Sequence, residues 1–177
     1  WALANTPADP SAIGVSGISY GAGSSLFAAA RDPRIKAVAA LSGWASLAES
    51  LYANHTPSAQ GVLLLSYASY LGKPGALMQA VNQRVAALDF FGAVEAVLPQ
   101  ADVRSPATEV DRLNANGTAV LLANAFEDSL FVPGQYIDFY NRLTGPRRLM
   151  FTHGDHATSG LTGALGLPNE VYDSVDR

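Results

Sequence analysis

The clearest chemical signal in the chain is a serine between two glycines, in Gly17-Ile18-Ser19-Tyr20-Gly21. This segment fits the G-x-S-x-G pattern, in which a sharp strand-to-helix turn exposes the serine hydroxyl as a nucleophile. Both glycines are expected where a Cβ would strike the neighbouring helix or strand. The N–H of Tyr20, at the start of the following helix, is the predicted donor to an oxyanion. The pattern predicts acyl transfer, and its alternative is a purely structural turn.

A serine nucleophile needs a base to take its proton, and the chain offers three histidines, His55, His153 and His156. His55 lies in a segment expected to be helical, where a solvated loop histidine is the simpler interpretation. The other two follow the apolar run Arg148–Phe151, and a loop after the last sheet strand is where a hydrolase base is expected. We prefer His156 because His153 follows the strand too closely to reach across the sheet edge. His153 remains the alternative.

The base needs an acid to orient it, and two carboxylates follow the apolar run Ala119–Ala123. Loops after parallel strands converge at the carboxyl ends of the strands, so an acid in this loop can meet His156. Asp128 is the preferred acid, and Glu127 is the alternative, with a solvent-facing loop charge as its simpler interpretation. The resulting chain order of Ser19, Asp128 and His156 is that of α/β-hydrolases.

Apolar runs of strand length alternate with helical segments at both ends of the chain. Each strand–helix–strand unit with short joints predicts parallel pairing, so we expect a mostly parallel α/β sheet covered on both faces. A final helix is expected to begin at Asn169. The strands are predicted at Ile13–Ser16, Ile35–Leu41, Ala119–Ala123 and Arg148–Phe151, and the helices between them at Ala22–Arg31 and Gly134–Leu143.

The middle of the chain has a different, helical pattern. Leu77, Val81, Val85 and Leu88 recur at helical spacing and form one apolar stripe. The helical region is about 70 residues long, which exceeds the usual length of a connection between strands. We therefore divide the chain into a nucleophile unit at 1–43, a helical insertion at 44–115 and the remainder of the core at 116–177.

Composition excludes several other classes of protein. The chain has 177 residues and carries a formal net charge of −4. It is 49% hydrophobic and only 15% charged, and this apolar content excludes a disordered tail. It has no basic run that would bind nucleic acid, and no apolar stretch approaches the ~18 residues of a membrane span. Zero cysteines exclude a thiolate metal site and a cysteine nucleophile. We expect a soluble protein with no cofactor or metal and no visible signal peptide.

Several segments resemble the family of Xaa-Pro dipeptidyl-peptidases and cocaine-esterase-like acyl hydrolases, which have the α/β-hydrolase fold. The resemblance implies Ser19 as nucleophile, Asp128 as orienting acid and His156 as base. It also implies that the helical insertion is a cap over the acyl or peptide pocket. The segments are Trp1, Ile13–Gly21, Arg34–Val38, Arg104–Pro106, Glu127–Pro133 and Arg147–Leu149 leading into His156.

The position of Ser19 so early in the chain suggests a partial domain. In the family about four strands precede the nucleophile, so we expect 177 residues beginning at Trp1 to form only the C-terminal half of the usual catalytic domain. A truncated sheet exposes a strand edge, which predicts a complementary N-terminal segment or self-association. The predicted function is hydrolysis of a small carboxylic ester or amide through an acyl-enzyme. The alternatives are an Xaa-Pro dipeptidyl-peptidase and a non-catalytic binding or structural module.

Overall fold

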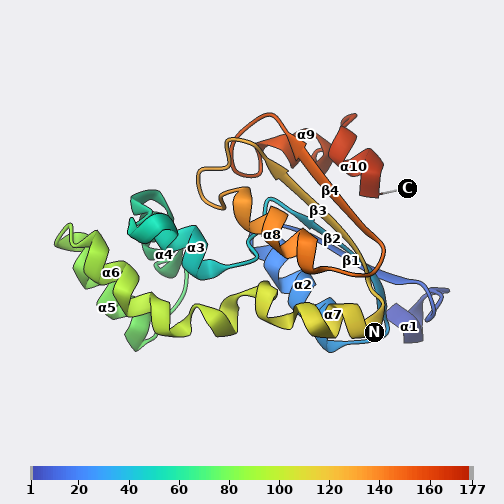
Figure 1. The fold of residues 1–177 in the computed structure, drawn as a ribbon, viewed down its shortest axis with the longest axis horizontal. Helices are drawn as coiled ribbons and strands as arrows, with labels where there is room; N and C mark the ends of the chain where they lie inside the picture. The colour runs from blue at the N-terminus through green and yellow to red at the C-terminus, as the bar shows by residue number, and fades with distance from the viewer. Residues whose placement is uncertain (1, 176–177) are drawn as a thin grey trace. The chain divides into compact units, whose positions relative to one another are not determined.

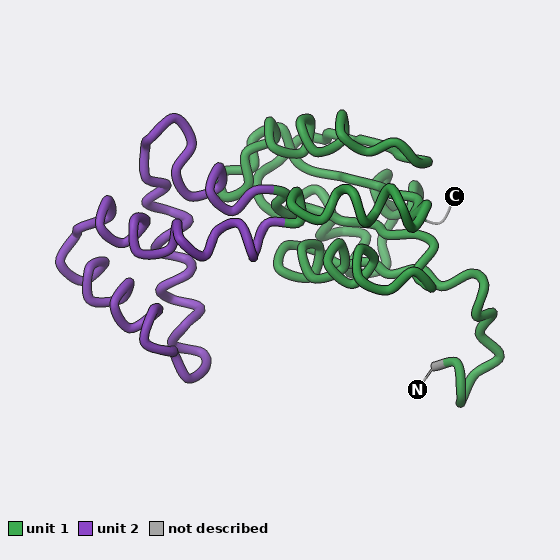
Figure 2. The backbone as a smooth tube through the Cα atoms, turned by 60° about the horizontal axis from the view of Figure 1, so that its bottom comes forward, with its two compact units in different colours: residues 1–45, 106–177 green, residues 46–105 purple. Residues whose placement is uncertain are grey.

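The computed structural model describes residues 2–175, and Trp1 lies outside the described residues (Figure 1). The chain divides into two compact units, each of which is described by itself (Figure 2). The first unit contains residues 1–45 and 106–177 and holds the sheet, whereas the second contains residues 46–105 and is helical. The helical insertion expected at 44–115 thus has a compact part at 46–105, and residues 106–115 group with the sheet.

The sheet of the first unit has four parallel strands in the order β1-β2-β3-β4. The register sets Ile18 beside Leu41, and Ala125 beside Thr152, so the carboxyl ends of the strands meet at one edge. The predicted mixed α/β architecture with a parallel sheet is therefore confirmed. The strands are β1 (Ile13–Ile18), β2 (Ile35–Leu41), β3 (Ala119–Ala125) and β4 (Arg147–Thr152).

One face of this sheet is fully packed by three helices, α2 (Tyr20–Arg31), α7 (Val110–Asn116) and α8 (Gly134–Arg142). Alternate strand residues face them, because side chains along a strand point to opposite faces. The core on this face contains Leu26, Val38, Leu113, Leu122, Tyr136 and Phe139, all nearly or fully buried. Burial of each such large side chain contributes about 1.5–3 kcal/mol, so this face supplies most of the apolar stabilisation of the unit.

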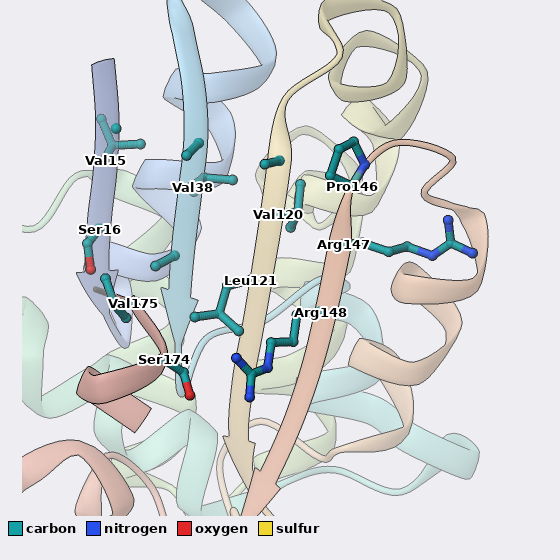
Figure 3. Close-up of a pocket in the computed structure, with 14 residues that line it drawn as sticks. Val15, Ser16, Val38, Val120, Leu121, Pro146, Arg147, Arg148, Ser174 and Val175 are labelled. Carbon is teal, nitrogen blue, oxygen red and sulfur yellow. The ribbon is translucent and has the colours of Figure 1, made fainter. Parts of the chain in front are cut away.

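Within residues 2–175, the opposite face is covered only near the carboxyl ends of the strands. There α10 (Glu170–Val175) packs Val171 against Leu41 and Ala123, next to α9 (Thr158–Ala164). Toward the amino ends, the described residues leave a hollow of about 500 Å³ over the sheet, flanked by Arg148 (Figure 3). The expectation of a sheet covered on both faces is therefore wrong for this part of the described structure. The strand residues under the hollow are mostly small: Gly14, Ser16, Ala37, Ala39, Ala119 and Leu121.

The second unit is built around its own apolar core, which includes Leu51, Val62, Val81 and Val94. The predicted stripe is correct for Leu77, Val81 and Val85, which pack in this core. It is wrong for Leu88, which is 75% exposed because the helix ends at Ala86 and Leu88 has a positive φ of 58°. The helices are α3 (Leu47–Tyr52), α4 (Ala59–Ser69), α5 (Ala76–Ala86) and α6 (Phe90–Val97).

Short helical turns complete the described structure. Side chains cap three helices of the second unit: Ser46 accepts a hydrogen bond from the N–H of Glu49, Ser58 from Gly61 and Asp89 from Gly92. No helix in residues 2–175 is both long and apolar enough to cross a membrane. The remaining elements are α1 (Ala2–Asn5) and the 3₁₀ turns η1 (Ala53–His55), η2 (Leu98–Gln100), η3 (Asp102–Arg104) and η4 (Pro106–Glu109).

Candidate active site

Ser19 occupies a strained turn between β1 and α2. Its backbone has φ 56° and ψ −118°, a conformation that costs a non-glycine residue about 1–3 kcal/mol. The turn is held from both sides, because the N–H of Ser19 donates to the carbonyl of Leu41 at 2.9 Å and the N–H of Ala22 donates to the carbonyl of Ser19 at 3.0 Å. The surrounding structure therefore fixes the serine at the carboxyl edge of the sheet.

The two glycines of the motif have different surroundings. A Cβ on Gly17 would collide with the backbone of Gly21, so the turn can close only if residue 17 has no side chain. A Cβ on Gly21 itself would meet nothing within 4 Å. The expectation that both glycines avoid a collision is therefore correct for Gly17 and wrong for Gly21, whose backbone rather than side-chain position makes the close approach.

His156 lies on the loop that follows β4 and faces Ser19. Its Nε2 is 2.8 Å from the Ser19 hydroxyl oxygen, and its Nδ1 is 3.1 Å and 3.3 Å from the two carboxylate oxygens of Asp128. The imidazole side chain is 16% exposed, and the ring of Phe131 meets it edge-on at 5.0 Å between centroids. The structure thus links Ser19, His156 and Asp128 in one hydrogen-bonded chain.

Asp128 sits in the loop after β3 with its side chain fully buried. Its Oδ1 accepts hydrogen bonds from the N–H groups of Leu130 at 3.0 Å and Phe131 at 2.8 Å. The side-chain amide of Asn124 donates to the carbonyl of Phe131 at 2.8 Å, which ties the end of the loop back to the strand. A buried carboxylate needs such donors to offset its lost hydration, and these also fix its orientation toward His156.

The alternative candidates are placed differently. His153 is exposed at the start of the same loop as His156, and Glu127 is exposed with its Oε2 accepting from the N–H of Gly154 at 3.1 Å. Within residues 2–175, neither His153 nor Glu127 makes a hydrogen bond to Ser19 or His156. His55 belongs to the helical unit, where it lies edge-on against Tyr52.

The N–H of Tyr20 lies at the start of α2, directly after Ser19. The first N–H groups of a helix have no partner within the helix and carry partial positive charge. This position favours negative charge developing on an atom next to Ser19. The phenol of Tyr20 is 78% exposed and its ring lies 5.8 Å from that of Trp44.

Trp44 is a residue of this region that the sequence reasoning did not identify. Its ring lies between those of Tyr20 and Phe131, at 5.8 Å and 5.4 Å between centroids, and it is 7% exposed. A Cβ on Gly23 would collide with the indole, so the glycine in α2 makes room for it. Trp44 follows the end of β2, so the convergence of loops at the carboxyl ends of parallel strands places it at this edge of the sheet but does not specify which rings it contacts.

The remaining polar groups of the unit do not form a metal centre. Among residues 2–175, no group of three or more His, Asp or Glu side chains is arranged to hold a metal ion.

Burial raises the pKa of the Tyr136 phenol above its usual range, and the nearby negative charge of Asp128 acts in the same direction. That phenol therefore stays protonated beneath the site.

Comparisons with known proteins assign the chain to a family. The model for the "X-Pro dipeptidyl-peptidase (S15 family)" matches residues 1–158 of the chain. A search of curated proteins finds no significant match. The chain therefore belongs to the X-Pro dipeptidyl-peptidase family, whose members are serine hydrolases with the α/β-hydrolase fold.

Solved structures show the same fold at low sequence identity. Acylaminoacyl peptidase from Pyrococcus horikoshii is 20% identical with a TM-score of 0.56, and the match covers 91% of this chain and 22% of that chain. An esterase from Pyrococcus furiosus is 17% identical with a TM-score of 0.55, covering 93% and 51%. Acetyl xylan esterase 1 from Thermoanaerobacterium sp. is 20% identical with a TM-score of 0.51, covering 92% and 46%. The chain thus spans about a fifth of the peptidase and about half of each esterase.

Proposed function

We propose that this chain carries the catalytic centre of a serine hydrolase that acts by acyl transfer, with Ser19 as nucleophile, His156 as general base and Asp128 as orienting acid. The observation that supports it most directly is the unbroken hydrogen-bonded chain, with 2.8 Å from Ser19 Oγ to His156 Nε2 and 3.1 Å from His156 Nδ1 to Asp128. These distances lie within the range in which a base takes a proton from its nucleophile.

In the proposed reaction, Ser19 Oγ attacks the carbonyl carbon of the substrate while its proton passes to Nε2 of His156. Asp128 accepts the hydrogen bond from Nδ1 and stabilises the imidazolium that forms. The N–H of Tyr20 donates to the carbonyl oxygen as it gains charge. The proton on Nε2 then passes to the leaving alcohol or amine as its bond to carbon breaks. Water, deprotonated by the same histidine, attacks the acyl-enzyme, and the proton returns to Ser19 as the acid leaves.

We favour a small carboxylic ester or amide as substrate, and this is the finer part of the proposal. The partly exposed ring of Phe131, which meets the imidazole of His156 edge-on, offers an apolar surface for an acyl group. The second candidate is cleavage of an Xaa-Pro peptide, which the family match favours. Parallel assays with a p-nitrophenyl ester and an Ala-Pro-p-nitroanilide separate the two, since each releases a chromophore only when its own bond is cleaved.

The experiment that tests the proposed centre is covalent labelling of the intact chain with a fluorophosphonate probe. We expect stoichiometric labelling that Ser19→Ala abolishes and Ser24→Ala leaves intact. Ser24 is a matched control because it lies one turn further along α2, where its hydroxyl donates to the carbonyl of Tyr20 at 3.0 Å. A folded wild-type chain that takes up no label would contradict the proposal and favour the alternative of a non-catalytic module.

We also propose that the free side of β1 pairs with a complementary segment of polypeptide or with a second copy of the chain. Two features support this. β1 pairs with β2 along one side only in the described sheet, and the adjoining hollow is lined by small residues that admit close approach.

We also propose, as the resemblance implies, that the helical unit acts as a cap that selects among acyl groups.

A further inference from the structure

The loop after β3 and the loop after β4 are joined by a carboxylate that takes no direct part in the proposed proton transfer. Asp155 immediately precedes His156, and Ser129 immediately follows Asp128. Asp155 Oδ1 accepts hydrogen bonds from the N–H of Ser129 at 2.8 Å and from its hydroxyl at 2.7 Å. Asp155, next to the proposed base, is therefore hydrogen-bonded to Ser129, next to the proposed acid.

The same oxygen also fixes the backbone of the base. Asp155 Oδ1 accepts a third hydrogen bond, from the N–H of His156 at 2.7 Å. The N–H of Asp155 donates to the hydroxyl of Thr158 at 2.9 Å, and that hydroxyl donates to the carbonyl of Asp155 at 2.8 Å. Residue 155 is thus bonded through its side chain, its N–H and its carbonyl, which leaves the start of the loop little freedom.

The base loop requires such support because the residue after the histidine has an unusual backbone. Ala157 has φ 59°, in the left-handed region that an alanine rarely adopts without tertiary constraint, whereas the positive φ of 115° at Gly154 is ordinary for a glycine. The strands β3 and β4 end side by side at Ala125 and Thr152, so they bring the two loops close but do not fix their tips. The bonds made by Asp155 span the gap between the tips.

We propose that Asp155, acting through Ser129, is a positioning residue that holds His156 Nδ1 within hydrogen-bond distance of Asp128. This inference rests on the proposed function for its catalytic consequence, although the geometry it concerns is measurable without turnover. The Asp155 carboxylate accepts hydrogen bonds as an ionised group, and its pKa lies below the usual range because the Ser129 hydroxyl and N–H donate to it.

The chain offers a matched control for a carboxylate of this kind. Asp9 Oδ1 accepts hydrogen bonds from the N–H of Ser11 at 2.8 Å and from its hydroxyl at 2.7 Å, the same pattern that Asp155 makes with Ser129. Asp9 lies before β1, its bonds stay within its own turn, and its pKa is lowered for the same reason. Substitution of Asp9 removes an equivalent pair of hydrogen bonds without affecting the two loops.

The test has two readouts on the intact chain. The first is the low-field proton resonance of the His156 Nδ1–H that donates to Asp128, observed in ¹⁵N-histidine-labelled protein, in which His55 and His153 serve as internal references. We expect Asp155→Ala to broaden or abolish this resonance and Asp9→Ala to leave it unchanged. Circular dichroism and thermal melts verify that both variants fold.

The second readout is the rate of fluorophosphonate labelling at Ser19. Misplacement of a catalytic group by about 1 Å can cost about 10²-fold, so we expect Asp155→Ala to slow labelling by roughly 10–100-fold. Where turnover is measured, the loss falls on kcat with KM nearly unchanged. Asp155→Asn is expected to lose less than Asp155→Ala, since its amide oxygen still accepts hydrogen bonds. Ser129→Ala is expected to slow labelling and Ser129→Thr to restore it.

Each outcome decides a different point. A wild-type chain that shows the Nδ1–H resonance but no labelling contradicts the proposed function, and the response of that resonance to Asp155→Ala still decides the positioning role. An Asp155→Ala variant that keeps both the resonance and the wild-type labelling rate overturns the inference. A loss equal to that of Asp9→Ala does so as well, because it would reflect general stability alone.

Discussion

The two ends of the same four strands differ in how closely their surroundings are determined. At the carboxyl ends, a strained serine, a buried carboxylate and a half-buried imidazole are each fixed by several hydrogen bonds. At the amino ends, one face of the sheet carries small residues under a hollow of about 500 Å³. We therefore expect one end of this sheet to tolerate almost no change and the other end to accept change readily.

Asp128→Asn should give the largest loss of activity. The neutral amide can donate to Nδ1 and so favour the wrong imidazole tautomer, and it lacks the charge that stabilises the imidazolium, so kcat is expected to fall about 10⁴-fold. Steady-state hydrolysis of a p-nitrophenyl ester measures the loss. The matched change at the other end, Arg148→Gln beside the hollow, should leave kcat within about twofold, because single surface substitutions away from a site are nearly neutral. Similar losses for the two variants would contradict the comparison.

Two glycines of β1 test the same contrast within a single strand. Gly17→Ala places a Cβ against the backbone of Gly21 and should destabilise the chain by about 1–3 kcal/mol. Gly14→Ala places its Cβ 3.7 Å from the nearest heavy atom, the carbonyl oxygen of Ala37, and should stabilise by about 0.4–1 kcal/mol. Urea denaturation gives both free energies of unfolding. A Gly14→Ala chain less stable than Gly17→Ala would reverse the expected order.

Ser16→Arg probes the proposed use of the open end of the sheet. Ser16 is exposed on β1 and lines the hollow, so a long charged side chain there fills part of the hollow and obstructs close approach. If copies of the chain pair through this region, the dimer dissociation constant should rise at least about tenfold, or ~1.4 kcal/mol. Sedimentation velocity over a concentration series measures it, with Ser11→Arg as control. An unchanged constant would show that self-association does not use this face.

The smallest expected effect is on acid stability. The folded pKa of Asp155 lies below that of the unfolded chain, so its contribution to stability is complete above the unfolded pKa of ~3.9 and is lost as pH falls through the folded pKa. Asp155→Asn should therefore flatten the fall in unfolding free energy at acid pH relative to wild type. Asp32→Asn is a useful reference, because the bond from Arg34 lowers the Asp32 pKa to about 2. An identical pH dependence in wild type and Asp155→Asn would contradict the prediction.

The parts of the fold that repeat a strong local pattern were predictable from the sequence. Each buried strand is a short apolar run, so all four were located, although β1 extends beyond Ser16 to Ile18. Leu88 was misassigned because the apolar spacing continues past the residue where the helix breaks. The 3₁₀ turns and α7 lack a strong apolar period and were not anticipated.

The residues of the candidate site likewise fall into those that the sequence indicates and those that it does not. The choice of Ser19, Asp128 and His156 as candidate site residues rests on the G-x-S-x-G motif and on the order of the loops along the chain. Both are signals that can be read from the sequence. Trp44 and Asp155 depend on contacts between loops distant in the chain, and no local pattern specifies which loop tips will touch. The open face of the sheet was missed for a similar reason, since small strand residues are compatible both with a closely packed cover and with none.

The backbone of Ser19 implies that the chain sacrifices thermal stability at one position. Its positive φ of 56° favours glycine, so Ser19→Gly should relieve the strain and raise the melting temperature while removing the hydroxyl. The backbone that presents the proposed nucleophile thus costs the chain stability at the position where that hydroxyl is to act.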